Sequence, residues 1–184
     1  MKHYVGNISI IFDCEQLISE INAVNVDTQH GHMILPPDNP FYQEYIRQTT
    51  ALELAGYDEH VVEYRHYQAG EHFSYSYAEK FAQFVDANPL MCWVSEIYPG
   101  KCTPWHWDIN PWEQEQLKLG TLVRYFMFLS KPAPGHVFVT EDDCYYNENQ
   151  GAVYQYEHIH SWHAGTNVGL IPKYLMTFTG YKTK

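Results

Sequence analysis

The stretch TLVRYFMFL, residues 121–129, is the most hydrophobic strand-like run of the sequence. It belongs to a region, from residue 90 onward, in which short β-branched and aromatic runs are separated by clusters of Gly, Pro, Asn and Asp. Such a pattern is typical of strands joined by turns. We therefore expect strands over residues 91–98, 105–109, 122–129, 136–140, 152–156, 162–166 and 174–181.

The first half of the chain carries helical signals instead. Apolar residues recur at helical spacing over residues 15–24, and again in a segment that opens at Asn39-Pro40 and stops at Gly56. A third helix is expected over residues 77–87. Three amphipathic helices therefore precede the strand-rich region.

This order of elements indicates the fold class. Helices followed by strands favour an antiparallel sandwich or barrel buttressed by helices, because an interleaved βαβ fold would alternate the two. The expected fold is mainly β with helical cover (α+β). We expect a single domain over residues 1–184, with a helical N-terminal part over 1–89 and a β core over 90–184.

Composition and charge exclude several classes of protein. The 184 residues include 11 Lys and Arg against 22 Asp and Glu, so the net charge of −11 disfavours nucleic acid as a partner. The four cysteines form no C-x-x-C pair, which argues against a zinc knuckle and favours reduced thiols in a cytoplasmic protein. No apolar run is long enough to span a membrane, and we expect no membrane partner.

A His-x-Asp motif lies inside the β region, at His106-Trp107-Asp108. Side chains alternate along a strand, so His106 and Asp108 are expected on one face and Trp107 on the other. Two ligands from one strand can reach the same ion. The motif is weak alone and needs a further histidine to complete a two-histidine, one-carboxylate site, which leaves positions on Fe(II) open.

Three histidines downstream are candidates for that second histidine: His158, His160 and His163. We favour His163, which begins a strand-like segment and precedes Lys173 by ten residues. His160 remains open as the ligand if the strand begins earlier. His158 is expected to be solvated or to lie behind the ligands.

The order of these features resembles a known family, the Fe(II)- and 2-oxoglutarate-dependent oxygenases, which are built on the double-stranded β-helix (jelly roll). The resemblance covers roughly residues 90–181. Within the family, the sequence is similar to prolyl hydroxylase-like or aspartyl/asparaginyl hydroxylase-like members. The matching segments are Tyr98-Pro-Gly100, His106-Trp-Asp108, the strand 122–129, Gly135-His-Val-Phe-Val139, Gly151-Ala-Val-Tyr154, His163-Ala-Gly-Thr-Asn167 and Lys173-Tyr-Leu175.

The resemblance implies a reaction and a set of ligands. His106, Asp108 and His163 would bind Fe(II), with 2-oxoglutarate and O₂ at the open positions, and the enzyme would hydroxylate an unactivated C–H bond. Family members most often anchor the distal carboxylate of 2-oxoglutarate with arginine, whereas this sequence has Lys173 at the corresponding place.

The same resemblance indicates two further residues as candidates for binding 2-oxoglutarate. Arg124 is the competitor of Lys173 as the anchor of 2-oxoglutarate, and Tyr98 corresponds to a tyrosine that often hydrogen-bonds the cosubstrate. The substrate is expected to be an amino acid, another small molecule, or a peptide or protein side chain. Two other functions remain open: a cupin-type metal protein that does not use 2-oxoglutarate, with His158-Ile-His160 as added ligands, and a non-catalytic β-helix binding module.

Overall fold

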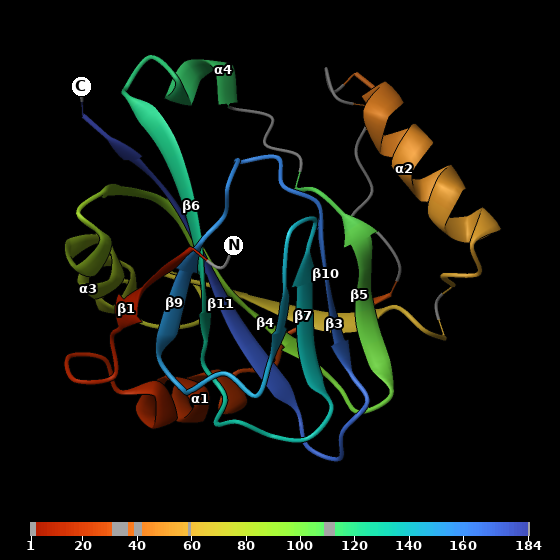
Figure 1. The fold of residues 1–184 in the computed structure, drawn as a ribbon, viewed down its shortest axis with the longest axis horizontal. Helices are drawn as coiled ribbons and strands as arrows, with labels where there is room; N and C mark the ends of the chain where they lie inside the picture. The colour runs from red at the N-terminus through yellow and green to blue at the C-terminus, as the bar shows by residue number, and fades with distance from the viewer. Residues whose placement is uncertain (1–2, 31–36, 39–41, 59, 109–112, 184) are drawn as a thin grey trace.

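Two antiparallel sheets form the body of the protein in its computed structural model, which describes residues 3–30, 37–38, 42–58, 60–108 and 113–183. The larger sheet has seven strands and the smaller has four (Figure 1). In spatial order the larger sheet contains β1 (Tyr4–Asn7), β9 (Ala152–Gln155), β6 (Thr121–Phe128), β11 (Lys173–Lys182), β4 (Asn88–Ile97), β3 (Glu63–Gln68) and β2 (Gln29–His30). The smaller contains β5 (Lys101–His106), β10 (His163–Asn167), β7 (His136–Thr140) and β8 (Cys144–Tyr146).

This arrangement confirms the expected class, a jelly-roll β core with helical cover. Six of the seven expected strands lie within three residues of their predicted bounds. The strand expected over residues 105–109 begins four residues earlier and ends at His106, and Ile109 lies outside the described residues. The expectation that strands lie only behind residue 90 is wrong, because β1, β2 and β3 of the N-terminal half join the larger sheet. The short strand β8 was also missed.

Alternation along β6 gives the larger sheet two different apolar faces. Val123, Tyr125 and Met127 pack into the core that contains the helices, whereas Phe126 and Phe128 pack into a second core with residues of the smaller sheet. The second face therefore looks into the space between the two sheets. Arg124, which has the same parity as Phe126, also belongs to this inner face.

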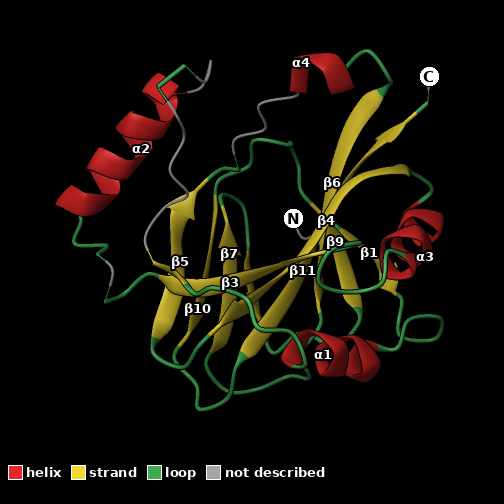
Figure 2. Ribbon diagram, turned by 180° about the vertical axis from the view of Figure 1, so that it is seen from behind, coloured by secondary structure: helices red, strands yellow, loops and turns green. Residues whose placement is uncertain are grey.

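Two helices cover the outer face of the larger sheet, as Figures 1 and 2 show. They are α1 (Cys14–Asn22) and α3 (Ser76–Val85), and Asp13 caps α1 by accepting a hydrogen bond from the Gln16 backbone N–H. The helix α2 (Tyr42–Leu54) lies apart from them beside β5, and the short α4 (Glu113–Gln116) precedes β6. All three expected helices are confirmed, although Asn39-Pro40 lies outside the described residues.

The helices of the described residues are short, and the longest of them, α2, has 13 residues. None of these helices combines the length and the apolar character that crossing a bilayer requires.

Candidate metal centre

The structure brings His106, Asp108 and His163 together. One ligand atom from each lies within 4.8 Å of the others. The two oxygens of Asp108 divide between the histidines: Oδ1 lies 3.4 Å from Nε2 of His106, and Oδ2 lies 3.3 Å from Nε2 of His163. Two imidazoles and one carboxylate are the donor set of the facial site of non-haem Fe(II) oxygenases.

Strand register places the two histidines opposite each other. β5 and β10 pair antiparallel, with His106 directly across from His163. Asp108 differs from the expectation, because β5 ends at His106 and the aspartate lies in the segment that follows it. The strand alternation that predicted the pair therefore does not by itself hold Asp108 in place.

Backbone carbonyls fix the orientation of both imidazole rings. Nδ1 of His106 lies 2.6 Å from the carbonyl oxygen of Pro104, and Nδ1 of His163 lies 2.9 Å from that of Ser161. A carbonyl can only accept, so each Nδ1 carries a proton. In a neutral ring Nε2 then presents its lone pair to the carboxylate of Asp108, and a proton or a metal cation must lie between these acceptors. Histidine ligands of metals are typically held in this way.

A buried arginine compensates the charge of Asp108. Nη2 of Arg124 lies 2.5 Å from Oδ2 of Asp108. Burial opposes ionisation of Asp108, but Arg124 and the two histidines outweigh it and hold the pKa of this carboxyl well below its usual value. Burial also lowers the pKa of His163, whereas at His106 the Asp108 carboxylate outweighs burial and raises the pKa.

One side of the cluster is open to solvent. The side chains of His106 and Asp108 are 23% and 29% exposed, whereas that of His163 is 7% exposed. His66, on the neighbouring strand β3, is exposed as well. Small molecules can therefore reach the cluster from this side, while His163 closes the other.

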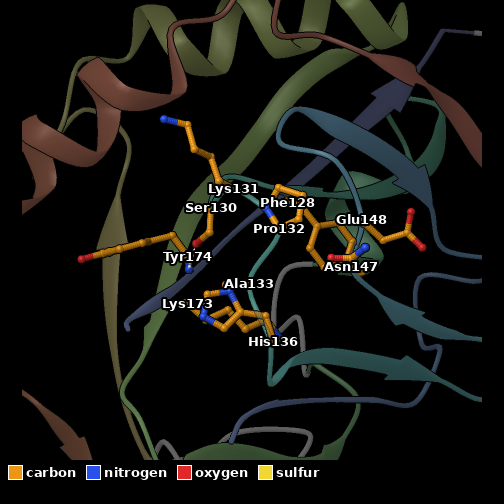
Figure 3. Close-up of a pocket in the computed structure, with 10 residues that line it drawn as sticks. All are labelled: Phe128, Ser130, Lys131, Pro132, Ala133, His136, Asn147, Glu148, Lys173 and Tyr174. Atoms are coloured by element: carbon orange, nitrogen blue, oxygen red, sulfur yellow. Dashed lines mark hydrogen bonds between the residues drawn. The ribbon is translucent and has the colours of Figure 1, made fainter. Parts of the chain in front are cut away.

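Lys173 is a buried cation on the inner face of the sheet. It is 1% exposed, its ammonium donates a hydrogen bond to the Val137 carbonyl, and it lies over the ring of Phe138 at 5.5 Å. Burial lowers the pKa of Lys173 to about 7. No carboxylate of the described residues forms an ion pair with it. Figure 3 shows the pocket beside Lys173, in which Glu148 points away and binds the Tyr154 hydroxyl instead.

A glycine on β10 lies between the ammonium of Lys173 and the metal ligand His163. Gly165 follows His163 by two residues on β10. A Cβ atom on this glycine would lie 3.4 Å from Nζ of Lys173, 3.1 Å from Oγ1 of Thr103 and 2.9 Å from Cδ1 of Ile97. The ammonium and a hydroxyl thus face the one position on this strand that has no side chain, next to the ligand His163.

The depressed pKa of Lys173 predicts a pH-dependent stability of the metal-free protein. Between pH 7 and 10.5 the unfolded chain keeps a proton on Lys173 that the folded chain lacks, so the free energy of unfolding rises with pH. The expected slope is about 1.4 kcal/mol per pH unit. Denaturant unfolding at several pH values should show this slope in wild type relative to Lys173→Met. Parallel curves for the two proteins would contradict it.

Tyr98 lies away from the cluster. Ile97 pairs with Lys173 across the sheet and shares its inner face, so the next residue, Tyr98, faces the outer side. There the guanidinium of Arg65 lies over its ring at 5.3 Å. The structure therefore does not bring Tyr98 together with His106, Asp108, His163 and Lys173.

Aromatic residues of β3 and β4 line the inner face and were missed by the sequence analysis. Tyr64 pairs with Ile97 and is thus aligned with Lys173 across three strands. Burial, together with the negative charge of Asp108, raises the pKa of Tyr64 to about 12. The ring of His66 lies 4.8 Å from that of Tyr64 and 6.4 Å from that of Trp93. Only the pairing of β3 with β4, which the sequence does not display, reveals these residues.

The other candidate histidines lie outside the cluster. The ring of His160 packs on that of Trp107 at 4.6 Å, and Trp107 donates a hydrogen bond to Glu44 of α2. The side chain of His158 is 72% exposed and lies 4.0 Å from Glu157. Of the three downstream histidines, the structure places only His163 among the described residues that could share a metal ion.

Comparisons with known proteins give likenesses of structure only. No protein-family model and no curated protein sequence matches the chain. A prolyl-4-hydroxylase from Pseudomonas putida matches at 11% identity with a TM-score of 0.46, over 92% of this chain and 99% of that one.

Two further solved structures are similar at the same level. A viral collagen prolyl hydroxylase from Paramecium bursaria Chlorella virus-1, in complex with 2-oxoglutarate, matches at 12% identity and a TM-score of 0.44, over 98% and 97% of the two chains. A predicted oxalate decarboxylase from Thermotoga maritima matches at 12% identity and a TM-score of 0.39, over 65% and 82%.

Proposed function

We propose that the protein is an Fe(II)- and 2-oxoglutarate-dependent dioxygenase that hydroxylates an unactivated C–H bond. The observation that carries the proposal is the pairing of a His-Asp-His cluster with Lys173, a buried cation that lacks a carboxylate partner among the described residues. An isolated buried charge is costly unless it is paired. A dianionic cosubstrate that reaches from the metal to Lys173 supplies the missing partner.

Three residues hold the metal in this proposal: His106 and His163 through Nε2, and Asp108 through its carboxylate. The donor set and the ring orientations fit Fe(II). With 2-oxoglutarate and O₂ bound, the iron supplies the oxidation of the cosubstrate to succinate and CO₂ and the insertion of oxygen into the C–H bond. The protein orients these groups and admits the substrate from the open side of the cluster.

Lys173, rather than Arg124, anchors the distal carboxylate of 2-oxoglutarate in this proposal. The guanidinium of Arg124 already binds Asp108, whereas the ammonium of Lys173 binds only neutral groups among the described residues. A carboxylate at Lys173 would favour the charged ammonium and raise its pKa from the depressed value. Tyr64, aligned with Lys173 on the inner face, takes in this proposal the place that the resemblance gives to Tyr98, that of a tyrosine that hydrogen-bonds the cosubstrate.

The two alternative functions draw less support from the site. A cupin-type centre would need a further histidine, but His158 is largely exposed and His160 packs on Trp107. A non-catalytic module does not account for two imidazole rings locked with Nε2 toward a carboxylate.

Anaerobic titration with Fe(II) and 2-oxoglutarate tests the proposal. Chelation of Fe(II) by 2-oxoglutarate gives a weak visible charge-transfer band, which we expect to saturate at one equivalent of each per chain. Metal binding without this band would instead favour the cupin-type function. Absence of both metal binding and the band would favour the binding module.

The surroundings and the charge of the protein indicate a class of substrate. Two aromatic rings lie near the cluster: His66, on which the charges of Asp108 and His106 act, and Trp93, whose ring lies 6.4 Å from that of His66 and 5.2 Å from the guanidinium of Arg124. The protein's net charge of −11 disfavours polyanions. We therefore propose an amino acid, a peptide or protein side chain, or another small molecule as substrate, in a protein of the cytoplasm, and not a nucleic acid.

A further inference from the structure

The two oxygens of Asp108 are in different environments. Oδ2 lies 2.5 Å from Nη2 of Arg124 and 3.3 Å from Nε2 of His163, whereas the ion-pair contact of Oδ1 among the described residues is with Nε2 of His106, at 3.4 Å. Hydrogen bonds between ionised partners are among the strongest in proteins. Each oxygen of Asp108 therefore faces one of the two histidines, and Oδ2 is in addition bound by the guanidinium of Arg124.

Arg124 is itself fixed by its surroundings. Its guanidinium lies between the rings of Trp93 and Tyr156, at 5.2 and 5.5 Å from their centroids. Nη1 donates a hydrogen bond to the Ile159 carbonyl, and the residue is only 6% exposed. A planar guanidinium that binds through both Nη atoms and packs against two aromatic rings offers Asp108 a rigid partner. Its Nε has no partner among the described residues, so the interaction with Asp108 is its main compensation for burial.

We propose that Arg124 is the positioning residue of the metal centre: it binds one oxygen of Asp108 and thereby keeps the carboxylate a one-oxygen ligand. The inference rests on the proposed Fe(II) site and goes beyond it. A carboxylate free to turn could offer both oxygens and fill a position that the cosubstrate or O₂ needs. Arg124 thus serves the site through Asp108 and does not touch the cosubstrate.

A positioning role of Arg124 and a purely electrostatic role predict opposite changes in Fe(II) affinity when Arg124 is replaced. If Arg124 acted only as a nearby positive charge, its removal would strengthen the binding of a cation. If it positions Asp108, its removal weakens binding, because partners of metal ligands typically contribute about 10- to 100-fold in affinity. A purely structural role would lower the thermal stability and leave the affinity of the folded protein unchanged.

The test measures the Fe(II) affinity of Arg124→Gln by anaerobic competition with a chromogenic chelator, beside thermal unfolding of the metal-free protein. Arg65→Gln is the matched control, because Arg65 also lies over an aromatic ring but on the outer face of the sheet. We expect a roughly 10- to 100-fold loss of affinity in Arg124→Gln and none in Arg65→Gln.

Each outcome decides the inference. Unchanged or tighter Fe(II) binding by folded Arg124→Gln overturns the inference about Arg124. The proposed function is unaffected in that case, as long as the wild-type protein binds Fe(II). Failure of wild type to bind Fe(II) overturns both. If Arg124→Gln does not fold, Arg124→Lys carries the test, because it keeps the charge without the planar fork: weaker binding than wild type supports the inference, and equal binding overturns it.

Discussion

Replacing Asp108 by alanine is expected to lower the Fe(II) affinity more than about 100-fold, beyond the usual effect of a residue behind the ligands. Asp108 supplies the only carboxylate of the described cluster, and both imidazoles face it at 3.3 to 3.4 Å. The affinity can be measured by anaerobic equilibrium dialysis of the purified variant.

The matched control for Asp108→Ala is His158→Ala. His158 is the histidine that a cupin-type site would require, and its side chain is 72% exposed. We expect His158→Ala to bind Fe(II) as wild type does. Loss of binding in His158→Ala, with binding retained in Asp108→Ala, would reverse the assignment of the metal site.

A stability effect will accompany Asp108→Ala and must be separated from metal binding. The variant leaves the guanidinium of Arg124 buried without its carboxylate, which typically costs about 3–5 kcal/mol. The variant His163→Ala removes a ligand and leaves this ion pair in place. We expect it to lose Fe(II) binding with a smaller loss of unfolding free energy, so the two variants together distinguish metal loss from misfolding.

Replacing Lys173 by methionine is expected to weaken 2-oxoglutarate binding by about 30-fold. The reason is that losing one partner of a buried charge pair costs about 2 kcal/mol of binding free energy. Fe(II) binding should persist, because Lys173 is not a ligand. Methionine fills a similar volume without a charge, so the metal-free variant should be at least as stable as wild type at pH 7. Titration of the charge-transfer band with 2-oxoglutarate measures the loss.

Lys131→Met is the control for this substitution. Lys131 lines the same pocket as Lys173 (Figure 3). Its side chain, however, is 70% exposed and pairs with Glu15. Its removal should leave 2-oxoglutarate binding unchanged. Wild-type 2-oxoglutarate affinity in Lys173→Met would remove Lys173 as the anchor. If Arg124→Gln then lost 2-oxoglutarate affinity and not metal affinity, Arg124 would take its place.

The sequence predicted the strands and the three clustered residues because each leaves a local signal. Strands such as β6 and β11 are apolar on both faces, since helices cover one side and the smaller sheet the other. His106 and His163 are at the end and the start of paired strands, so spacing along the chain was enough to select them. Lys173 was selected through its distance from His163.

Other features depend on register and pairing, which a single sequence does not display. β3 reads EYRHYQ and looks like a polar loop, yet its alternate residues face two different cores. The resemblance indicates Tyr98 as a residue that hydrogen-bonds the cosubstrate. Tyr98 follows Ile97, which faces inward, so Tyr98 lies on the outer face, whereas Tyr64, the partner of Ile97 on β3, faces inward. The contact between Arg124 and Asp108 joins residues 16 positions apart along the chain through the tertiary fold alone.

A crystal structure with Fe(II), or Mn(II) as a surrogate, and the 2-oxoglutarate analogue N-oxalylglycine would show which residues bind the metal and the cosubstrate. The proposed function predicts one metal ion bound by Nε2 of His106, Nε2 of His163 and one oxygen of Asp108, with the distal carboxylate of the analogue on Nζ of Lys173. A metal ion at His158 and His160, or an analogue carboxylate on Arg124 with Lys173 unengaged, would contradict it.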